Sequence, residues 1–166
     1  MEKKYPIVKA DKLEEHLSFR QATKEDVYDI VKMLADDELG KKRENFTTPL
    51  PDVYYAAFNR IDQDPNQELI VVVENDSIIG TLQLSFIPYL TYQGGTRAQI
   101  EAVRIRKDRR GLGLGQRMFE WAINRAKAKG AHLLQLTVDK QRLESRRFYH
   151  KLGFRASHDG MKLHFS

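Results

Sequence analysis

The chain has 166 residues, 41% of them hydrophobic, which is enough for one globular domain with a buried core. Its 28 Lys and Arg residues against 23 Asp and Glu give a formal charge of +5, which favours an anionic partner without identifying it. The lack of cysteine excludes disulfides, thiolate metal sites and cysteine nucleophiles. Without an apolar leader or a run of about 18 apolar residues, the chain is expected to be cytoplasmic and not to enter a membrane.

The polar, weakly patterned start of the chain is interpreted as an N-terminal arm over residues 1–17, in front of one domain over residues 18–166. Early in that domain, Thr23 can cap a helix, and apolar residues follow it at spacings of three and four from Val27 to Leu34. This pattern predicts an amphipathic helix.

The next 27 residues are expected to hold a loop and a second helix. Segment 35–51 mixes charges of both signs with one glycine and two prolines, which is typical of a loop or a broken helix. Residues 52–61 then predict a helix with Val53, Ala57 and Ile61 on its apolar stripe.

Three strands are predicted in the middle of the chain. Runs 68–73 and 77–86 are β-branched and apolar, so they are expected to form antiparallel strands joined by a tight turn. In segment 96–106 the apolar residues alternate up to Ala102 and resume one residue out of phase at Val103. Either a β-bulge lies near these two residues or the alanine tolerates both faces, and periodicity leaves both readings open.

The remaining elements complete a mixed α/β order. A helix is predicted over 115–129, followed by a strand in 132–139, a helix in 142–152 and a final alternating strand in 161–165. The apolar stripe of the first of these helices is Leu114, Met118, Ala122 and Ala126. The predicted order is therefore β-α-α-β-β-β-α-β-α-β, in one α/β domain.

Three alternating glycines lie between a predicted strand and a helix, behind a run of basic residues. Gly111, Gly113 and Gly115 can expose backbone N–H groups at a helix N-terminus, which favours a phosphate. A Walker loop would need Lys and Ser or Thr after the last glycine, and these are absent. The dinucleotide fingerprint fails because Gln116 or Met118 stands where its third glycine belongs.

Arg110, Gly113 and Gly115 do match the pattern Arg/Gln-x-x-Gly-x-Gly/Ala. Together with "FYHKLGF" one strand and one helix later, this makes the sequence resemble the GNAT superfamily of N-acetyltransferases, over about 19–165. In that family a loop of this form binds the pyrophosphate of coenzyme A. The resemblance implies a single GNAT-like domain whose mixed, mostly antiparallel sheet is flanked by helices and has a bulged strand leading into the coenzyme loop.

The activity that the resemblance implies is transfer of the acetyl group of acetyl-CoA to a primary amine of a small molecule or peptide. The alternative is a coenzyme-A-binding sensor without turnover. Glu101 stands where family members often carry a general base, and Tyr149 where they carry the acid that protonates the thiolate. Otherwise Glu101 is a surface carboxylate paired with Arg97 or Arg104, and Tyr149 only packs its helix.

The resemblance also implies a set of residues that contact acetyl-CoA. They are Val103, Arg104 and Ile105 on the bulged strand, Arg109, Arg110, Gly111, Leu112, Gly113, Leu114, Gly115 and Gln116 in the loop, and Arg142 and Ser145. The last two stand where many family members have Asn and Ala, so the Asn contact is not carried over.

The acceptor and further partners are less defined. Asp36 and Asp37 are candidates to attract an ammonium group and Arg43 to hold a carboxylate. No metal site is expected because the histidines show no ligand spacing, and no nucleic acid is expected because the basic residues are scattered. A homodimer is left open.

Overall fold

The computed structural model of the protein describes residues 17–165. Five strands form one sheet in the order β1-β2-β3-β4-β5, with every pair antiparallel except β4 and β5, which are parallel. The strands are β1 Leu17–Gln21, β2 Gln67–Glu74, β3 Ser77–Pro88, β4 Thr96–Ile105 and β5 Leu133–Gln135. The mixed, mostly antiparallel sheet predicted from the sequence is thus confirmed.

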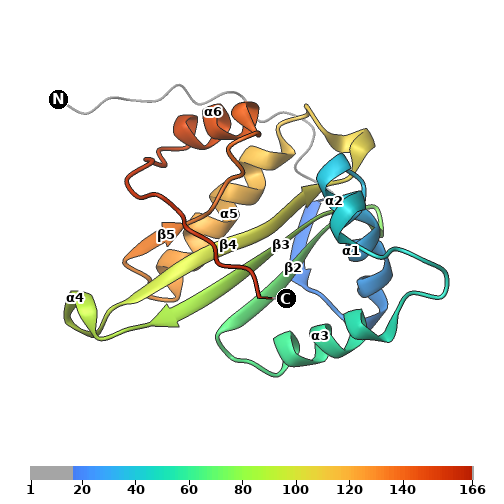
Figure 1. Ribbon diagram of the computed structural model, residues 1–166, viewed down its shortest axis with the longest axis horizontal. Coiled ribbons are helices and arrows are strands. Elements are labelled where there is room, and N and C mark those ends of the chain that lie inside the picture. Colours follow the sequence, from blue (N-terminus) through green and yellow to red (C-terminus); the bar gives the residue numbers. More distant parts are fainter. Residues whose placement is uncertain (1–16, 166) are drawn as a thin grey trace.

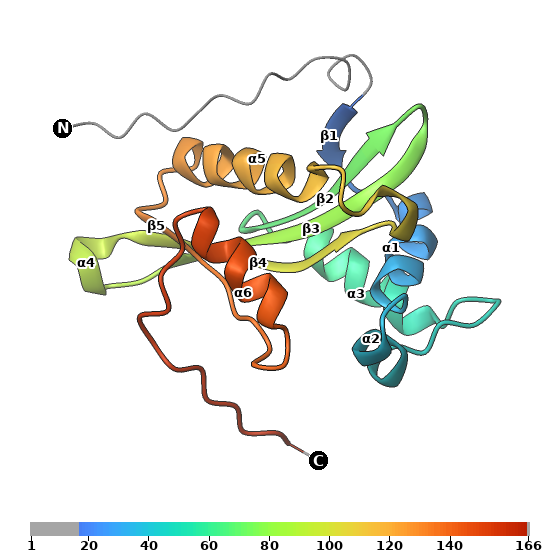
Figure 2. The same ribbon diagram turned by 90° about the horizontal axis from the view of Figure 1, so that it is seen from above.

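Residues 17–165 also form six α-helices and two short 3-10 turns, all of which lie between strands except the last helix, which follows β5. The helices are α1 Val27–Leu34, α2 Glu38–Arg43, α3 Asp52–Asp62, α4 Thr91–Gly94, α5 Leu114–Ala128 and α6 Leu143–Lys151, and the 3-10 turns are Lys24–Asp26 and Lys107–Arg109. Helices α1 to α3 gather at one end of the sheet, whereas β5 and α4 lie toward the other end (Figures 1 and 2). Among residues 17–165, no helix has the length and hydropathy needed to cross a bilayer.

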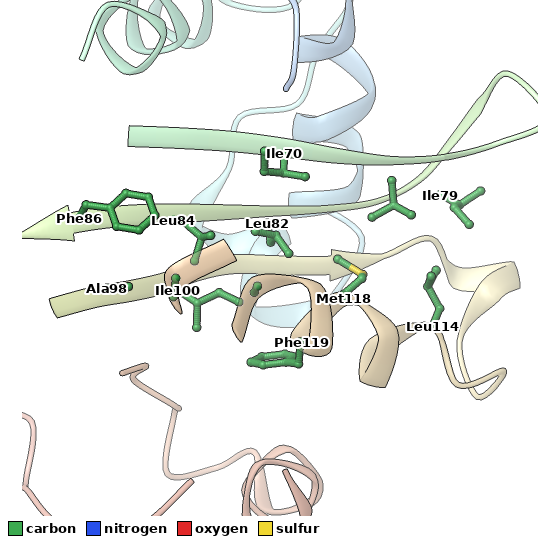
Figure 3. Packing of buried hydrophobic residues seen from close by; sticks show 13 residues of the cluster. Ile70, Ile79, Leu82, Leu84, Phe86, Ala98, Ile100, Leu114, Met118 and Phe119 are labelled. Atoms are coloured by element: carbon green, nitrogen blue, oxygen red, sulfur yellow. The ribbon is translucent and has the colours of Figure 1, made fainter. Parts of the chain in front are cut away.

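One face of the sheet is apolar and packs against α5. Side chains at alternate positions of β2, β3 and β4 meet the stripe of α5 that the sequence predicts (Figure 3). The buried members are Ile70, Val72, Ile79, Leu82, Leu84, Phe86, Ala98 and Ile100 from the strands, and Leu114, Met118, Phe119, Ala122 and Ala126 from α5. We call this surface of the sheet the α5 face.

The opposite face is divided into an apolar and a polar part. Under α1 and α3, Val71 is fully buried, with Leu69 and Val73 beside it. Farther toward β5, the alternation brings hydrophilic side chains to the same side, and these are not covered by a helix stripe. This part, which we call the polar face, consists of Gln67, Gln83, Ser85, Gln99, Glu101 and Gln135.

The phase change in β4 is a β-bulge. Thr81 pairs with Arg104 and Gln83 with Glu101, so three steps on β4 oppose two on β3. Ala102 absorbs the extra residue with a left-handed φ of 52°. Of the two readings of the sequence, the bulge is therefore confirmed.

Two details of the N-terminal half bear on the expectation. Segment 35–51 contains the helix α2, so of the two predicted alternatives, a loop or a broken helix, the broken helix is confirmed. Helix α3 forms as predicted, but Val53 is 63% exposed and Phe58 takes the buried position. Ala57 and Ile61 of the predicted stripe are half-buried, but the larger aromatic side chains of Phe58, Tyr54 and Tyr55 take the contact with the core in place of Val53.

The C-terminal prediction is wrong. No strand forms in 161–165, where Met161, Leu163 and Phe165 are 95%, 80% and 89% exposed. Figure 2 shows this segment running away from the sheet. Alternation predicts a strand only where a neighbouring edge can pair with it, and β5, predicted over 132–139, keeps just three paired residues. The predicted arm lies outside the described residues, apart from Leu17 in β1.

Candidate functional site

The glycine loop forms the entrance to α5. Gly111 and Gly113 have φ values of 78° and 81°, which a side chain adopts with strain, and Gly113 is the residue at the helix N-cap. Gly115 lies in the first turn, where an added Cβ would be 3.4 Å from both the Ile105 and Phe148 side chains. The loop therefore turns sharply, and its last glycine packs against side chains of β4 and α6.

The loop leaves backbone N–H groups and an open side at the N-terminus of α5. The first backbone hydrogen bond of the 15-residue helix α5 is donated by Arg117 N–H to the carbonyl of Gly113, so the N–H groups before Arg117 are those that a helix leaves without an internal acceptor. The helix dipole adds partial positive charge at the same end. An added Cβ at Gly111 or Gly113 would meet no atom within 4 Å, so the outer side of the loop is open.

The outer edge of β4 is free beyond Gln99. β5 pairs with β4 only up to Gln99 and Gln135, although β4 continues to Ile105 along β3. Two carbonyls point to this open side: that of Val103 accepts from Arg104 Nη1 at 2.8 Å, and that of Ile105 accepts from Arg110 Nε at 3.0 Å. The bulge thus lies in a strand edge that has no neighbouring strand beyond Gln99 among residues 17–165, and arginine side chains take the place of strand donors at two of its carbonyls.

The basic residues of the loop are engaged with carboxylates. Arg110 Nη2 lies 2.6 Å from Asp36 Oδ2, and Arg109 Nη2 lies 2.7 Å from Glu74 Oε2. Arg110 is the arginine that matches the first position of the coenzyme-loop pattern. Arg109 instead forms an ion pair with Glu74 at the end of β2. A phosphate at the loop would therefore share Arg110 with Asp36.

A second cluster joins α2, β4 and the start of α6 through Asp37. Arg142 Nη2 donates to Asp37 Oδ2 at 2.6 Å, and Arg104 Nη2 lies 3.9 Å from the same oxygen. The other oxygen of Asp37 caps α2 by accepting from Gly40 N–H at 2.6 Å. Burial raises the pKa of the Asp37 carboxyl, but the Gly40 N–H and the two guanidinium groups outweigh this and hold the pKa below its ordinary value.

Arg104 is the most enclosed cation of this cluster. Its side chain is 14% exposed, its Nε has no hydrogen-bond partner among the described residues, and burial lowers its pKa. The cluster therefore concentrates positive charge, since two guanidinium groups share one carboxylate.

Tyr149 lies beside this cluster on α6. Its ring packs against Phe119 and Phe148 with centroid separations of 5.3 Å and 5.6 Å, which fixes the direction of the side chain. Burial raises the pKa of the phenol, while the charges of Arg142 and Arg104 act in the opposite direction. The phenol of Tyr149 is thus protonated at neutral pH, and the charge of Arg104 in β4 reaches it.

Glu101 is exposed on the strand just before the bulge. It accepts a hydrogen bond from Gln99 Nε2, whereas Arg104 turns to Asp37 and Arg97 lies over the Tyr89 ring at 5.0 Å. Glu101 also lines an open groove of about 420 Å³ between α3 and the polar face. The residues around this groove are Ala57, Arg60, Ile61, Asp64, Gln67, Gln83, Ser85 and Glu101.

Comparison with known proteins identifies the family. The family model described as "Acetyltransferase (GNAT) family" matches residues 31–154, which include the bulge, the glycine loop and Tyr149. The chain belongs to this acetyltransferase family. An aminoalkylphosphonate N-acetyltransferase of Salmonella typhimurium is 26% identical over 144 residues, covering 84% of this chain and 85% of its own.

Solved structures have the same fold. A protein from Bacillus halodurans described as a transcriptional regulator superimposes with a TM-score of 0.87 at 53% identity, over 90% of this chain and 100% of its own. The glucosamine-6-phosphate N-acetyltransferase of Arabidopsis thaliana matches with a TM-score of 0.74 at 20% identity, over 92% and 100% of the two chains. The GNAT fold expected from the sequence is thereby confirmed.

For an acetyltransferase, the structure brings most of the predicted site residues together. The bulged strand, the glycine loop and Tyr149 surround the open edge of β4. Leu114 is instead buried in the core, Leu112 is 58% exposed, and Gln116 donates to Glu120 on the outside of α5. Ser145 is half-buried on α6.

Two features of this region could not be predicted from the sequence. Asp36 and Asp37, the candidates for attracting an ammonium group, form ion pairs with Arg110 and Arg142, and Arg43 pairs with Glu44. The groove under Glu101 was not predicted. The sequence does contain a signal for it, because polar residues stand at alternate positions of two strands, Gln83 and Ser85 in β3 and Gln99 and Glu101 in β4, and this marks a strand face that is not part of the core.

Proposed function

We propose that the protein transfers the acetyl group of acetyl-CoA to a primary amine of a small molecule or peptide. The observation that carries the proposal is the open edge of β4, which has an anion-binding helix N-terminus at one end, Tyr149 across from it and Glu101 on the strand itself. Membership of the acetyltransferase family supports the reaction type. The Salmonella relative, named as an N-acetyltransferase, supports nitrogen as the accepting atom.

The coenzyme is proposed to lie along this edge with its pyrophosphate at the glycine loop. The N–H groups around Gly111 to Gly115 would bind the phosphate oxygens, and Arg110 would contribute charge. The free edge from Val103 to Ile105 would hydrogen-bond the pantetheine arm as a neighbouring strand does, with Arg142 and Ser145 facing it from α6. Arg104 would add positive electrostatic potential to this edge, although its own side chain is largely shielded from solvent.

The chemistry needs a neutral nucleophile, a polarised carbonyl and a proton for the leaving sulfur. Glu101 would take a proton from the acceptor ammonium, directly or through water, because a free alkylamine has a pKa near about 10.4. The amine nitrogen then attacks the thioester carbonyl carbon, whose oxygen is stabilised by a backbone N–H of the bulged strand.

Collapse of the tetrahedral intermediate completes the transfer. The C–S bond breaks as the C–N bond is retained, and the sulfur takes the phenolic proton of Tyr149. The nitrogen loses its second proton, which returns to the phenolate through solvent, and Glu101 releases the first proton to solvent, so the enzyme ends in its starting state. The raised pKa of the phenol keeps that proton in place until the thiolate forms.

A second candidate is a coenzyme-A-binding regulator without turnover. It is favoured by the Bacillus halodurans relative, which is described as a transcriptional regulator. Glu101 and Tyr149 support the enzyme, because a sensor needs neither a base nor an acid at the thioester. The cytoplasmic location, the domain boundary near residue 18 and a homodimer stay predictions.

One assay separates these functions. The protein is incubated with acetyl-CoA and a panel of primary amines while thiol release is followed, and coenzyme binding is measured by calorimetry. We expect binding together with release that depends on the amine. Binding without release for any amine would favour the regulator, and absence of binding would contradict both.

A further inference from the structure

The polar face has a regular arrangement of hydrogen-bonding groups. Strand register places Gln67, Ser85, Gln99 and Gln135 in one row across β2 to β5, and Gln83 and Glu101 in the row beside it. Among these six residues Glu101 is the one that carries a charge, and the nearest cation of β4 on the same side, Arg97 in the next row, lies over the Tyr89 ring. The face is therefore made mainly of neutral amides and one hydroxyl group.

Side chains of this face are already hydrogen-bonded to one another. Gln67 Oε1 accepts from Gln83 Nε2 at 2.9 Å and from Ser85 Oγ at 2.7 Å. Gln99 Oε1 accepts from Gln135 Nε2 at 2.7 Å, and Gln99 Nε2 donates to Glu101. These bonds hold the amide groups in position before a ligand arrives, which reduces the entropy lost on binding.

The internal bonds leave a mixed set of groups for a ligand. Gln67 retains both amide hydrogens, while Gln83 and Gln135 each retain their oxygen and one hydrogen, among the contacts of residues 17–165. Donors and acceptors therefore lie side by side. A hydroxyl group, which donates one bond and accepts others, matches such a surface better than a carboxylate or phosphonate, which at neutral pH mainly accepts.

The charges that line the groove also favour an amine over a phosphonate or another dianion. The lining has two carboxylates, Glu101 and Asp64, and a single cation, Arg60. This balance attracts an ammonium group and offers little to a dianion. The volume of about 420 Å³ is within the range of small-molecule sites, which is about 300 to 1,000 Å³.

We infer that the acceptor is a small polyhydroxylated amine of the amino-sugar class. Its ammonium group lies toward Glu101 and its hydroxyl groups hydrogen-bond the glutamines of the polar face. This inference rests on the proposed acetyltransferase function and adds the substrate class. It assigns Gln83 as a specificity-determining residue, since Gln83 lies opposite Glu101 in the sheet register.

The test compares two amines of similar ring size on two protein variants. Glucosamine carries ring hydroxyl groups and cyclohexylamine carries none. For each amine, kcat/KM of the variant is divided by kcat/KM of the wild type, so the different chemical reactivities of the two amines do not affect the comparison. We expect Gln83→Leu to lower kcat/KM for glucosamine about tenfold or more, because hydroxyl groups lose their partner, and to leave cyclohexylamine within about twofold. Gln21→Leu, an exposed change on β1, is the matched control, and acetyl-CoA affinity checks that the donor site is intact.

Several results would overturn the inference. They are an equal loss for both amines in Gln83→Leu, or a higher wild-type kcat/KM for 2-aminoethylphosphonate or a short peptide than for every amino sugar tried. These outcomes all require turnover, so they differ from failure of the proposed function itself, in which acetyl-CoA is not bound or no amine releases thiol.

Discussion

The two faces of the sheet use the same alternation of residues for opposite purposes. On the α5 face, most side chains of β2, β3 and β4 are apolar and buried, and the carboxylate of Glu68 is enclosed among them. On the other side, the same strands bury Val71 under α1 and α3, but farther along they carry glutamines and Glu101, and a groove is left open. The α5 face is thus packed core along its length, whereas the opposite side is divided between a second core cluster and the polar groups that the proposed function requires.

The largest effect is expected at Tyr149. Tyr149→Phe removes the hydroxyl group but keeps the ring that packs on Phe119, so turnover should fall by about 100-fold while acetyl-CoA affinity and stability change little. Steady-state kinetics and calorimetry measure both. Tyr55→Phe, at a half-buried tyrosine near α1, is the control. An unchanged rate would remove Tyr149 from the mechanism.

Glu101→Gln should lower turnover about tenfold and alter its pH dependence, provided that the chemical step limits the rate. Because the side chain is exposed, the free energy of unfolding should stay the same. A pH-rate profile from pH 6 to 9.5 for both proteins is the measurement. If rate and profile are both unaltered, another group or water acts as the base.

A substitution on the α5 face should lower stability and leave turnover unchanged. Glu68 is 3% exposed and accepts from Arg125 at 2.6 Å and 2.8 Å, with Lys129 Nζ at 3.3 Å. Glu68→Gln should reduce the free energy of unfolding at pH 7 by about 2 kcal/mol and spare kcat. Exposed Glu38→Gln, which only loses a contact to Lys41, should change it by less than about 0.5 kcal/mol.

The same ion pair predicts a pH dependence of stability. Burial raises the pKa of Glu68, but the hydrogen bonds and charges of Arg125 and Lys129 outweigh burial and hold the pKa below its ordinary value. The stabilisation is therefore complete above the unfolded-state pKa of about 4.3 and is lost as pH falls through the lower, folded-state value. Urea unfolding at pH 7, 5 and 3 should show the difference between wild type and Glu68→Gln shrinking; a constant difference would contradict this.

The smallest effect is expected at Asp36. Asp36→Asn removes the carboxylate that binds Arg110, so the guanidinium becomes free for a phosphate and acetyl-CoA affinity should rise, by no more than about fivefold. Calorimetry against Asp62→Asn, an exposed change at the end of α3, measures it. Weaker binding would mean that Asp36 orients Arg110 for the coenzyme.

Local patterns in the sequence predicted the α5 face and the glycine loop, and they gave the bulge as one of two readings. Alternation, the stripe of α5 and the phase change at Ala102 all reflect contacts between near neighbours in the chain or the regular geometry of a strand. The final strand was wrong because Met161, Leu163 and Phe165 alternate without an edge to pair with. An alternating pattern shows which side chains a strand would bury, but it does not show whether a neighbouring strand is available for pairing.

Long-range ion pairs could not be predicted in the same way. Asp36 and Arg110 are separated by 74 residues and Asp37 and Arg142 by 105, and nothing in either local segment specifies the other. A charged loop residue is equally compatible with solvent, substrate or a distant arginine. The groove under Glu101 depends likewise on how α3 lies over the sheet, although the alternating glutamines that form its floor are visible in the sequence.

The central claim, that the glycine loop binds the phosphates of acetyl-CoA, is tested most directly by calorimetry on two matched variants. Gly113 and Gly130 both have a left-handed φ, 81° and 76°, with no atom within 4 Å of an added Cβ, and they lie at opposite ends of α5. We predict that Gly113→Asp abolishes acetyl-CoA binding by placing a carboxylate at the phosphate position, whereas Gly130→Asp, with equal backbone strain, binds like the wild type. Equal affinities for the two variants would contradict the assignment of the loop.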